Sequence, residues 1–214
     1  MYCPTHFEEQ RTEVLLGLIA QHPLATIVTQ SEGGLVADHI PMLYQDNAGA
    51  PGTLIGHVAK SNPLWQAAPA QEHLLIFHGP GTYISPNWYA TKAASGKVVP
   101  TWNYTVVHAY ATLTATQDPE AILRILTRLT NRHESPQAHP WQVTDAPADF
   151  TQKLLNSIVG IEFHITRLTG KWKVSQNQPQ ENQQSVVKGL RGSGSLETDQ
   201  MAELVTQFGA DLKK

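Results

Sequence analysis

The chain has 214 residues, of which 41% are hydrophobic and 15% are charged, a composition typical of a folded globular protein rather than a disordered one. Its 15 Lys and Arg against 18 Asp and Glu give a formal net charge of −3, which excludes the overall basic surplus of proteins that grip nucleic acid through its phosphates. The single cysteine, Cys3, excludes an internal disulfide and a multi-cysteine zinc site.

The N-terminal quarter is predicted to be one helix followed by strands. Thr5 and Glu8 have the spacing of a capping box, and the helix they begin is expected to end at His22-Pro23. Its apolar face is predicted to hold Phe7, Val14, Leu15, Leu18 and Ile19. The pattern then changes to strands at residues 24–29 and 35–44, joined by the glycine-bearing hairpin connection 31–34.

The next segments alternate between short strands and turns. We expect a turn over residues 46–52, a strand over 53–59 and a short helix over 63–68. A strand over 73–78 is predicted to end at Gly79-Pro80-Gly81. Residues 85–96 lack clear periodicity and indicate an ordered loop or an irregular helix. Residues 98–116, rich in Val, Thr, Tyr and Trp, predict one strongly curved strand or two strands joined by a bend.

The last third is predicted to be mainly helical. Asp118-Pro119 is a typical helix start, with a buried face of Ile122, Ile125, Leu126 and Leu129. A helix over 147–157 and a strand over 158–167 follow. The tail 179–214 contains two amphipathic helices separated by the flexible linker 192–195. About six strands without regular βαβ alternation predict an α+β fold with a mainly antiparallel sheet or small barrel.

The sequence lacks the motifs of the common enzyme classes. There is no G-x-G-x-x-G, Walker-type loop, H-E-x-x-H or G-x-S-x-G, and the ten histidines show no metal-ligand spacing, so we expect no metal site. No acid–base pair stands out, and the catalytic residues, if there are any, are unknown. No apolar run reaches membrane-spanning length and residues 1–11 do not resemble a secretory signal, so we expect a cytoplasmic protein without membrane association.

Three polar-aromatic blocks are the candidates for chemistry. In the first, residues 56–65, a strand ends and is followed at once by Lys60, Ser61 and Asn62. A cation, a hydroxyl and an amide at a strand-to-helix junction suit a phosphate dianion. The alternative is a polar loop that caps the following helix.

The second block comprises residues 83–92 and 98–104. Its aromatic and polar side chains could contact the faces and the polar edge of an isoalloxazine ring. The alternative is a set of core or dimer-interface aromatics, and both can hold if the ligand lies in the interface. The candidates are Tyr83, Ser85, Trp88, Thr101, Trp102 and Asn103.

The third block, residues 170–177, is predicted to be extended. Alternation would place Lys171, Lys173, Ser175 and Asn177 on one face, opposite Trp172, Val174 and Gln176. Such a basic, hydroxyl-bearing strip could close over a phosphate or a ribityl chain. A solvated edge strand protected by lysines is the alternative.

The blocks together resemble the PaiB-like family, described as FMN-binding negative transcriptional regulators. The resemblance covers residues 1–180 in the family's order. The motifs that carry it are Met1-Tyr2…Pro4…Phe7, GHVAKSNP…W at 56–65, GP…YISP…WY at 79–89, VPTWNY…VH at 99–108, IVGIE at 158–162 and GK…K…SQN at 170–177.

This resemblance implies a six-stranded FMN-binding split barrel of the pyridoxamine phosphate oxidase-like class, with peripheral helices, FMN as cofactor and a homodimer holding the flavin at its interface. Lys60 and Asn62 would face the phosphate, although the family often has Arg at position 60, which can contact a phosphate bidentately. Thr101, Trp102 and Asn103 would lie beside the flavin, and Lys173, Ser175 and Gln176 would come from the late segment.

The resemblance also bears on domains and activity. Residues 1–180 would form the FMN-binding domain and 181–214 a helical tail packed on or beside it. The family implies a transcriptional regulator, but the Gly-Ser-Gly-Ser joint between the tail helices is too loose for a fixed recognition helix, so we expect at most an indirect or weak association with DNA. The alternatives are an FMN-dependent oxidoreductase acting on an unknown small substrate and a module that only stores flavin.

Overall fold

The computed structural model describes residues 1–47, 51–68 and 70–211. Residues 48–50, within the predicted turn 46–52, lie outside the described residues. The chain forms two compact units. Unit 1 comprises Met1–Leu18, His78–Val107 and Thr169–Lys214, and unit 2 comprises Ile19–Phe77 and His108–Leu168.

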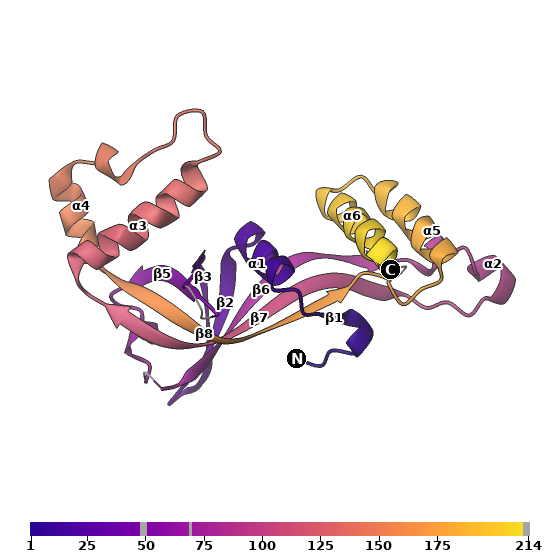
Figure 1. Cartoon of the computed structure of the whole chain (residues 1–214), viewed down its shortest axis with the longest axis horizontal. Coiled ribbons are helices and arrows are strands. Elements are labelled where there is room, and N and C mark those ends of the chain that lie inside the picture. Colours follow the sequence, from indigo (N-terminus) through magenta and orange to yellow (C-terminus); the bar gives the residue numbers. More distant parts are fainter. Residues whose placement is uncertain (48–50, 69, 212–214) are drawn as a thin grey trace. The chain divides into compact units, whose positions relative to one another are not determined.

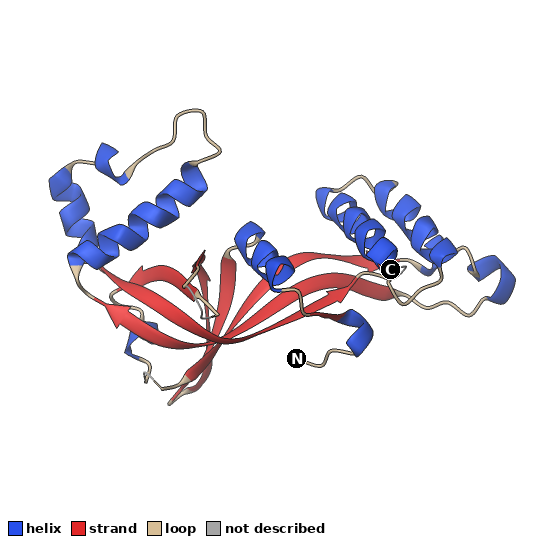
Figure 2. Cartoon of the chain, in the orientation of Figure 1, coloured by secondary structure: helices blue, strands red, loops and turns tan. Residues whose placement is uncertain are grey.

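The strands of the described residues form one eight-stranded sheet (Figure 2). Its order is β3-β2-β6-β7-β8-β5-β4, with β1 paired to β8, and every register that is defined is antiparallel. The strands are β1 Glu8–Glu9, β2 Leu24–Ser31, β3 Gly34–Pro41, β4 Leu43–Gln45, β5 Thr53–Ala59, β6 Glu72–Ile84, β7 Thr101–Thr116 and β8 Ile158–Lys173. The α+β class and the antiparallel sheet are confirmed, with eight strands rather than about six and a sheet that does not close.

Six α-helices accompany this sheet in the described part of the chain (Figure 1). They are α1 Thr12–Gln21, α2 Lys92–Ser95, α3 Pro119–Glu134, α4 Ala148–Leu155, α5 Gln180–Arg191 and α6 Leu196–Asp211. Four short 3₁₀ turns complete them, η1 Thr5–Phe7, η2 Pro63–Gln66, η3 Pro86–Trp88 and η4 Val143–Asp145. No helix among these residues is long and apolar enough to cross a membrane.

Unit 2 contains the paired strands β2 and β3, the paired strands β4 and β5, and α3. The predicted β2–β3 hairpin is confirmed, with Ser31 opposite Gly34, whose φ of 112° only glycine adopts readily. The Asp118 side chain accepts hydrogen bonds from the amides of Glu120 and Ala121, so α3 begins as the sequence predicts. A Cβ on Gly160 of β8 would lie 2.9 Å from the Ile125 side chain, so the glycine allows α3 to pack closely on the sheet.

Unit 1 contains the C-terminal helices, which lie side by side in Figure 1. Val186 and Leu190 of α5 and Met201 of α6 are fully buried. The Trp172 and Phe208 rings stack with centroids 6.2 Å apart and join α6 to β8. The two amphipathic helices and their glycine-containing joint are therefore as predicted.

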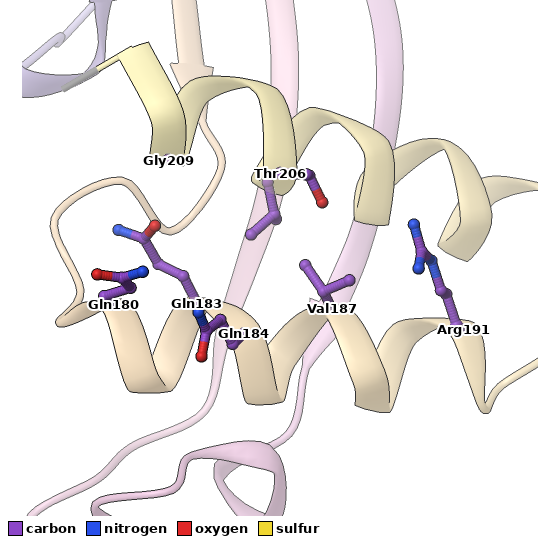
Figure 3. A pocket seen from close by; sticks show the side chains of 8 residues that line it. Gln180, Gln183, Gln184, Val187, Arg191, Thr206 and Gly209 are labelled. Carbon is purple, nitrogen blue, oxygen red and sulfur yellow. The ribbon is translucent and has the colours of Figure 1, made fainter. Parts of the chain in front are cut away.

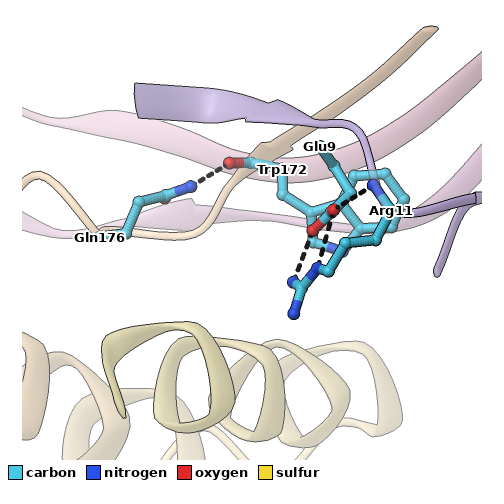
Figure 4. A network of polar contacts seen from close by, with 4 residues as sticks. All are labelled: Glu9, Arg11, Trp172 and Gln176. Carbon is cyan, nitrogen blue, oxygen red and sulfur yellow. Dashed lines mark hydrogen bonds and ion pairs between the residues drawn. The ribbon is translucent and has the colours of Figure 1, made fainter. Parts of the chain in front are cut away.

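The first helix does not begin at a capping box. Thr5–Phe7 form a 3₁₀ turn without a side-chain cap, and α1 begins at Thr12. Between them Glu8 and Glu9 pair with Lys171 and Gly170, so long-range strand pairing overrides the local signal. The neighbouring Glu9 accepts hydrogen bonds from the backbone amide and the guanidinium of Arg11 (Figure 4).

Two predicted strand ends were also wrong. β6 continues through Gly79-Pro80-Gly81 to Ile84. A Cβ at Gly79 would lie 2.2 Å from Thr105 Oγ1 and 2.8 Å from Leu18, so this glycine permits close packing on β7 rather than ending the strand. β8 likewise runs on from residue 167 to Lys173.

Candidate functional site

The twelve candidate residues fall into both units. Unit 2 holds Lys60, Ser61 and Asn62, directly after β5. Unit 1 holds the other nine, on or beside the ends of β6, β7 and β8: Tyr83, Ser85, Trp88, Thr101, Trp102, Asn103, Lys173, Ser175 and Gln176.

A cavity of about 470 Å³ in unit 1 brings four of the nine together. Thr101 and Asn103 line it from the start of β7, and Lys173 and Ser175 line it from the end of β8 and the turn beyond. Its volume is in the range of small-molecule sites. The complete lining is Phe7, Tyr89, Thr91, Lys97, Val98, Val99, Thr101, Asn103, Lys173, Ser175, Asn177, Gln178, Pro179 and Asn182.

Two side-chain hydrogen bonds join the residues that β7 contributes to this cavity to those from β8 and the turn after it. Asn103 Nδ2 donates to Ser175 Oγ at 2.8 Å, and both residues are almost completely buried. The Lys173 ammonium donates to the Thr101 hydroxyl. Ser175 has a φ of 63°, the one positive value among the non-glycine residues described, and this turn lets its hydroxyl reach Asn103.

Gln176 supports this wall without lining the cavity. Its Oε1 accepts from the Val174 amide at 2.8 Å, and its Nε2 donates to the Trp172 carbonyl (Figure 4). Both polar atoms of the Gln176 side chain therefore bond to the backbone at and after the end of β8. The predicted alternation beyond Lys173 is wrong, because the strand ends there and Ser175 and Gln176 are both buried in a turn.

The alternative of a solvated edge strand at residues 170–177 does not describe Lys171. Lys171 is only 8% exposed, because β1 covers this part of β8. Its ammonium donates to the Tyr2 carbonyl at 3.2 Å and lies 5.2 Å from the centroid of the Tyr104 ring. Lys171 thus has a packing role in unit 1.

The four remaining candidates of unit 1 have different surroundings. Tyr83 and Trp102 are 45% and 58% exposed and form an edge contact with centroids 6.5 Å apart. Ser85 caps η3 by accepting from the Asn87 amide at 3.2 Å. Trp88 packs against Gly189 of α5, where a Cβ would lie 2.4 Å from its indole ring. None of these four lines the cavity.

In unit 2 the side chain of Asn62, one of the three polar residues after β5, is already hydrogen-bonded. Asn62 Oδ1 accepts from the Leu64 amide at 2.8 Å, which caps η2, and Nδ2 donates to Asp38 at 2.7 Å. The helix-capping alternative therefore describes Asn62. Ser61 and Asn62 line a cavity of about 840 Å³ that also contains the carboxylates of Glu32 and Asp38. Lys60 is exposed beside this cavity, leaving its ammonium available to an anion.

The sequence reasoning missed several residues of the unit 1 cavity. Lys97 follows α2, and Asn182 lies in the first turns of α5, in the segment expected to be a tail. Asn182 is 3% exposed and bonds to Thr91 twice, through the Thr91 amide at 3.1 Å and hydroxyl at 3.0 Å. A single asparagine in an amphipathic helix carries no signal that distinguishes it from a surface residue.

A second hollow in unit 1, of about 380 Å³, lies between α5 and α6 (Figure 3). Gln183, Arg191 and Thr206 are among the side chains that line it. Gln183 Nε2 donates to the Gln178 carbonyl at 2.8 Å, so this glutamine also fixes the turn after β8. No candidate residue lines this hollow.

Three histidines outside the unit 1 cavity are shielded from water. Burial lowers the pKa of His22, His57 and His73, and His73 Nδ1 hydrogen-bonds to Thr29 Oγ1 at 3.0 Å. His73 Nε2 has no hydrogen-bond partner among the described residues. Within the same residues no group of three His, Cys, Asp or Glu side chains could hold a metal ion.

Sequence comparison places this chain in an FMN-binding domain family. Residues 1–167 match the family model described as “Putative FMN-binding domain”. An uncharacterized protein of Aspergillus fumigatus is 32% identical across 100% of this chain and 99% of its own length. The protease synthase and sporulation protein PAI 2 of Bacillus subtilis is 29% identical over 96% of each chain.

Solved structures show the same fold. The FAD and heme binding protein from Mycobacterium smegmatis aligns with a TM-score of 0.56 at 19% identity, covering 78% of this chain and 73% of that chain. The flavocytochrome Anf3 from Azotobacter vinelandii aligns with a TM-score of 0.54 at 14% identity, covering 78% and 69%. At these identities the likeness concerns the fold alone.

Proposed function

Because this chain belongs to the FMN-binding domain family whose model covers residues 1–167, with FMN or a related flavin as its cofactor, we propose that it holds the flavin with the residue groups described above. The donor set fits such a ligand. Hydroxyls, amides and two lysines line the unit 1 cavity, and a flavin mononucleotide presents carbonyl oxygens, a ribityl chain and a phosphate to such groups. When bound, the flavin supplies redox chemistry.

The individual roles follow from which polar atoms are free. Lys60 and Ser61 are exposed and suit the phosphate, whereas Asn62 acts by holding the loop, because its amide is already bonded. Asn103 is bonded to Ser175 and Lys173 to Thr101, and the donors and acceptors that these bonds leave, such as Asn103 Oδ1 and the other ammonium hydrogens of Lys173, would contact polar flavin atoms. Ser85, Trp88 and Gln176 would position the backbone around them, and Tyr83 and Trp102 offer exposed aromatic faces to the ring system.

The observation that carries the proposal is the buried Asn103–Ser175 hydrogen bond beside a lysine-bearing cavity, within a family defined by FMN binding. The test is a titration of purified protein with FMN, followed by absorbance and flavin fluorescence. Shifted absorbance bands and quenched fluorescence at micromolar FMN are expected. Unchanged flavin spectra at that concentration would refute flavin binding.

We propose further that two copies assemble around the flavin. Val99, Tyr83 and Trp102 are 73%, 45% and 58% exposed on unit 1. Aromatic side chains such as those of Tyr83 and Trp102 are enriched in protein interfaces. A second copy would remove these apolar surfaces from water. Residues 1–180 would form the flavin-binding part and 181–214 a tail, whose α5 lines the cavity.

For the biological role we propose regulation rather than catalysis, in line with the sporulation-protein relative. α5 carries Lys188 and Arg191, but α6 carries Glu197, Asp199 and Glu203, so these helices do not form a basic surface for direct DNA contact. We therefore expect regulation to act through another protein in the cytoplasm, where the lone Cys3 would stay reduced.

Two measurements separate the roles. Salt-sensitive retention of the protein on DNA would overturn the indirect mechanism. Anaerobic bleaching of the bound flavin by NADH or NADPH, at a rate above that of free FMN, would favour the alternative of an FMN-dependent oxidoreductase.

A further inference from the structure

The unit 1 cavity has an unbalanced charge. Lys97 and Lys173 line it, and no Asp or Glu side chain does. The Lys97 ammonium has no hydrogen bond or ion pair among the described residues, and Lys173 contacts only the neutral Thr101 hydroxyl. Two cations that face one concavity without a counter-ion repel each other, and an anionic ligand removes that repulsion.

The other polar groups of the lining extend this preference. Thr91, Thr101 and Ser175 contribute hydroxyls, and Asn177 and Gln178 contribute amides, all of which can donate to oxygen atoms. Lysine with hydroxyl and amide donors is the chemistry that recognises phosphate and carboxylate groups. We infer that this cavity is an oxyanion-binding site in which Lys97 and Lys173 supply the charge.

The C-terminal helix α5 completes this site through Asn182. Asn182 Oδ1 accepts from the Thr91 amide, and Nδ2 donates to the Thr91 hydroxyl and to Gln178 Oε1, the latter at 3.2 Å. One buried side chain thus ties the segment before Lys97 to the turn after Lys173. Asn182 is a positioning residue, and it lies beyond residue 167, where the match to the family model ends.

Two sources could supply the oxyanion: the phosphate of the bound flavin, or, if that phosphate is held through Lys60, a second small phosphate or carboxylate. The choice between these sources rests on the proposed flavin site. The anion site itself does not, because the two lysines and the tie through Asn182 belong to the chain itself.

The first experiment uses the flavin-free protein and inorganic phosphate, measured by isothermal titration at low ionic strength. Saturable binding is expected, and Lys97→Met should weaken it about tenfold, the typical effect of one charged hydrogen bond. Lys188→Met, which removes the same charge from an exposed site on α5 outside the cavity, is the matched control. Absence of phosphate binding below about 10 mM, or equal effects of the two variants, would overturn the inference.

The second experiment identifies the source by comparing FMN with riboflavin, which lacks the phosphate. If the flavin phosphate occupies the cavity, Lys97→Met removes the preference for FMN and inorganic phosphate competes with FMN. If a second anion occupies it, Lys60→Met removes that preference and phosphate binds together with FMN. Failure of both flavins to bind would refute the proposed function, while the phosphate titration would still decide the anion site.

A third comparison tests Asn182. Asn182→Ala should weaken phosphate binding about fivefold by releasing the Thr91 segment. Val186→Ala, also in α5 and fully buried, lowers stability without touching Thr91 and should retain the phosphate affinity. Equal losses of affinity in the two variants would show that Asn182 acts only through stability and would overturn its positioning role.

Discussion

Asn103 and Ser175, from β7 and from the turn after β8, hydrogen-bond to each other across 2.8 Å while 1% and 3% exposed. The bond gives a buried amide donor and a buried hydroxyl oxygen a partner. It also joins the start of β7 to the turn after β8 where both line the unit 1 cavity. The backbone of Ser175 adopts a positive φ to make the contact. This combination of strain, burial and a shared cavity separates the pair from the other candidate residues.

We therefore predict that Asn103→Ala weakens both the fold and the flavin site. Loss of the donor leaves the Ser175 hydroxyl buried without its partner, which costs about 1–3 kcal/mol of unfolding free energy. FMN affinity should fall about tenfold, because the cavity wall is no longer held. Denaturant unfolding of the flavin-free protein and FMN titration measure the two effects. Thr114→Ala, on an exposed position of the same strand in unit 2, should leave FMN affinity unchanged.

How far the sequence predicts this arrangement depends on the range of each signal. The Asp118 cap and the Ser31–Gly34 hairpin depend on neighbouring residues only, and both were predicted correctly. The start of α1 depends on Glu8 pairing with Lys171, which is distant in the chain, so the local capping pattern was misleading. Gly79 belongs to a Gly-Pro-Gly segment that is typical of a strand end, yet in the structure it leaves room for the Thr105 side chain to pack against β6.

The candidate site divides in the same way. Asn103 and Ser175 were selected as members of separate motifs, but their contact follows only from the neighbouring ends of β7 and β8. The sequence predicts that Asn62 faces a phosphate, and only the fold reveals that its Nδ2 already donates a hydrogen bond to Asp38. Asn182 was missed because helical periodicity describes which face is apolar and does not identify a buried polar residue that ties a loop.

The two glycines Gly79 and Gly17 form a matched pair for testing close packing. Gly79→Ala would place a Cβ 2.2 Å from Thr105 Oγ1 and 2.8 Å from Leu18, so we expect a loss of about 1–3 kcal/mol. Gly17→Ala in α1 meets nothing within 4 Å and should instead stabilise the protein by about 0.5–1 kcal/mol through higher helix propensity. Chemical denaturation of both variants measures the difference, and equal signs would contradict the packing role of Gly79.

Buried histidines predict a dependence of stability on pH. Burial lowers the pKa of His73 below its ordinary value of 6.5, so the unfolded chain binds a proton there more readily than the folded one. Stability from this group is complete above about pH 6.5 and is lost as the pH falls towards the folded-state pKa. Urea unfolding from pH 8 to pH 5 should show this decline. His73→Gln should make the decline shallower but not abolish it, because burial also lowers the pKa of His22 and His57. An unchanged decline in His73→Gln would contradict the contribution of His73.

Exposed aromatics of unit 1 give the test of self-association. Trp102 is 58% exposed, so Trp102→Ala removes little from the fold of one chain, but in the centre of a dimer interface such a truncation weakens association about 30-fold or more. Light scattering after size-exclusion chromatography should show a dimer for the natural chain and monomers for Trp102→Ala at low micromolar concentration. Trp141→Ala, 46% exposed in unit 2, is the matched control and should remain dimeric. A monomeric natural chain would refute the dimer. A dimeric Trp102→Ala variant would show that the dimer interface does not depend on Trp102.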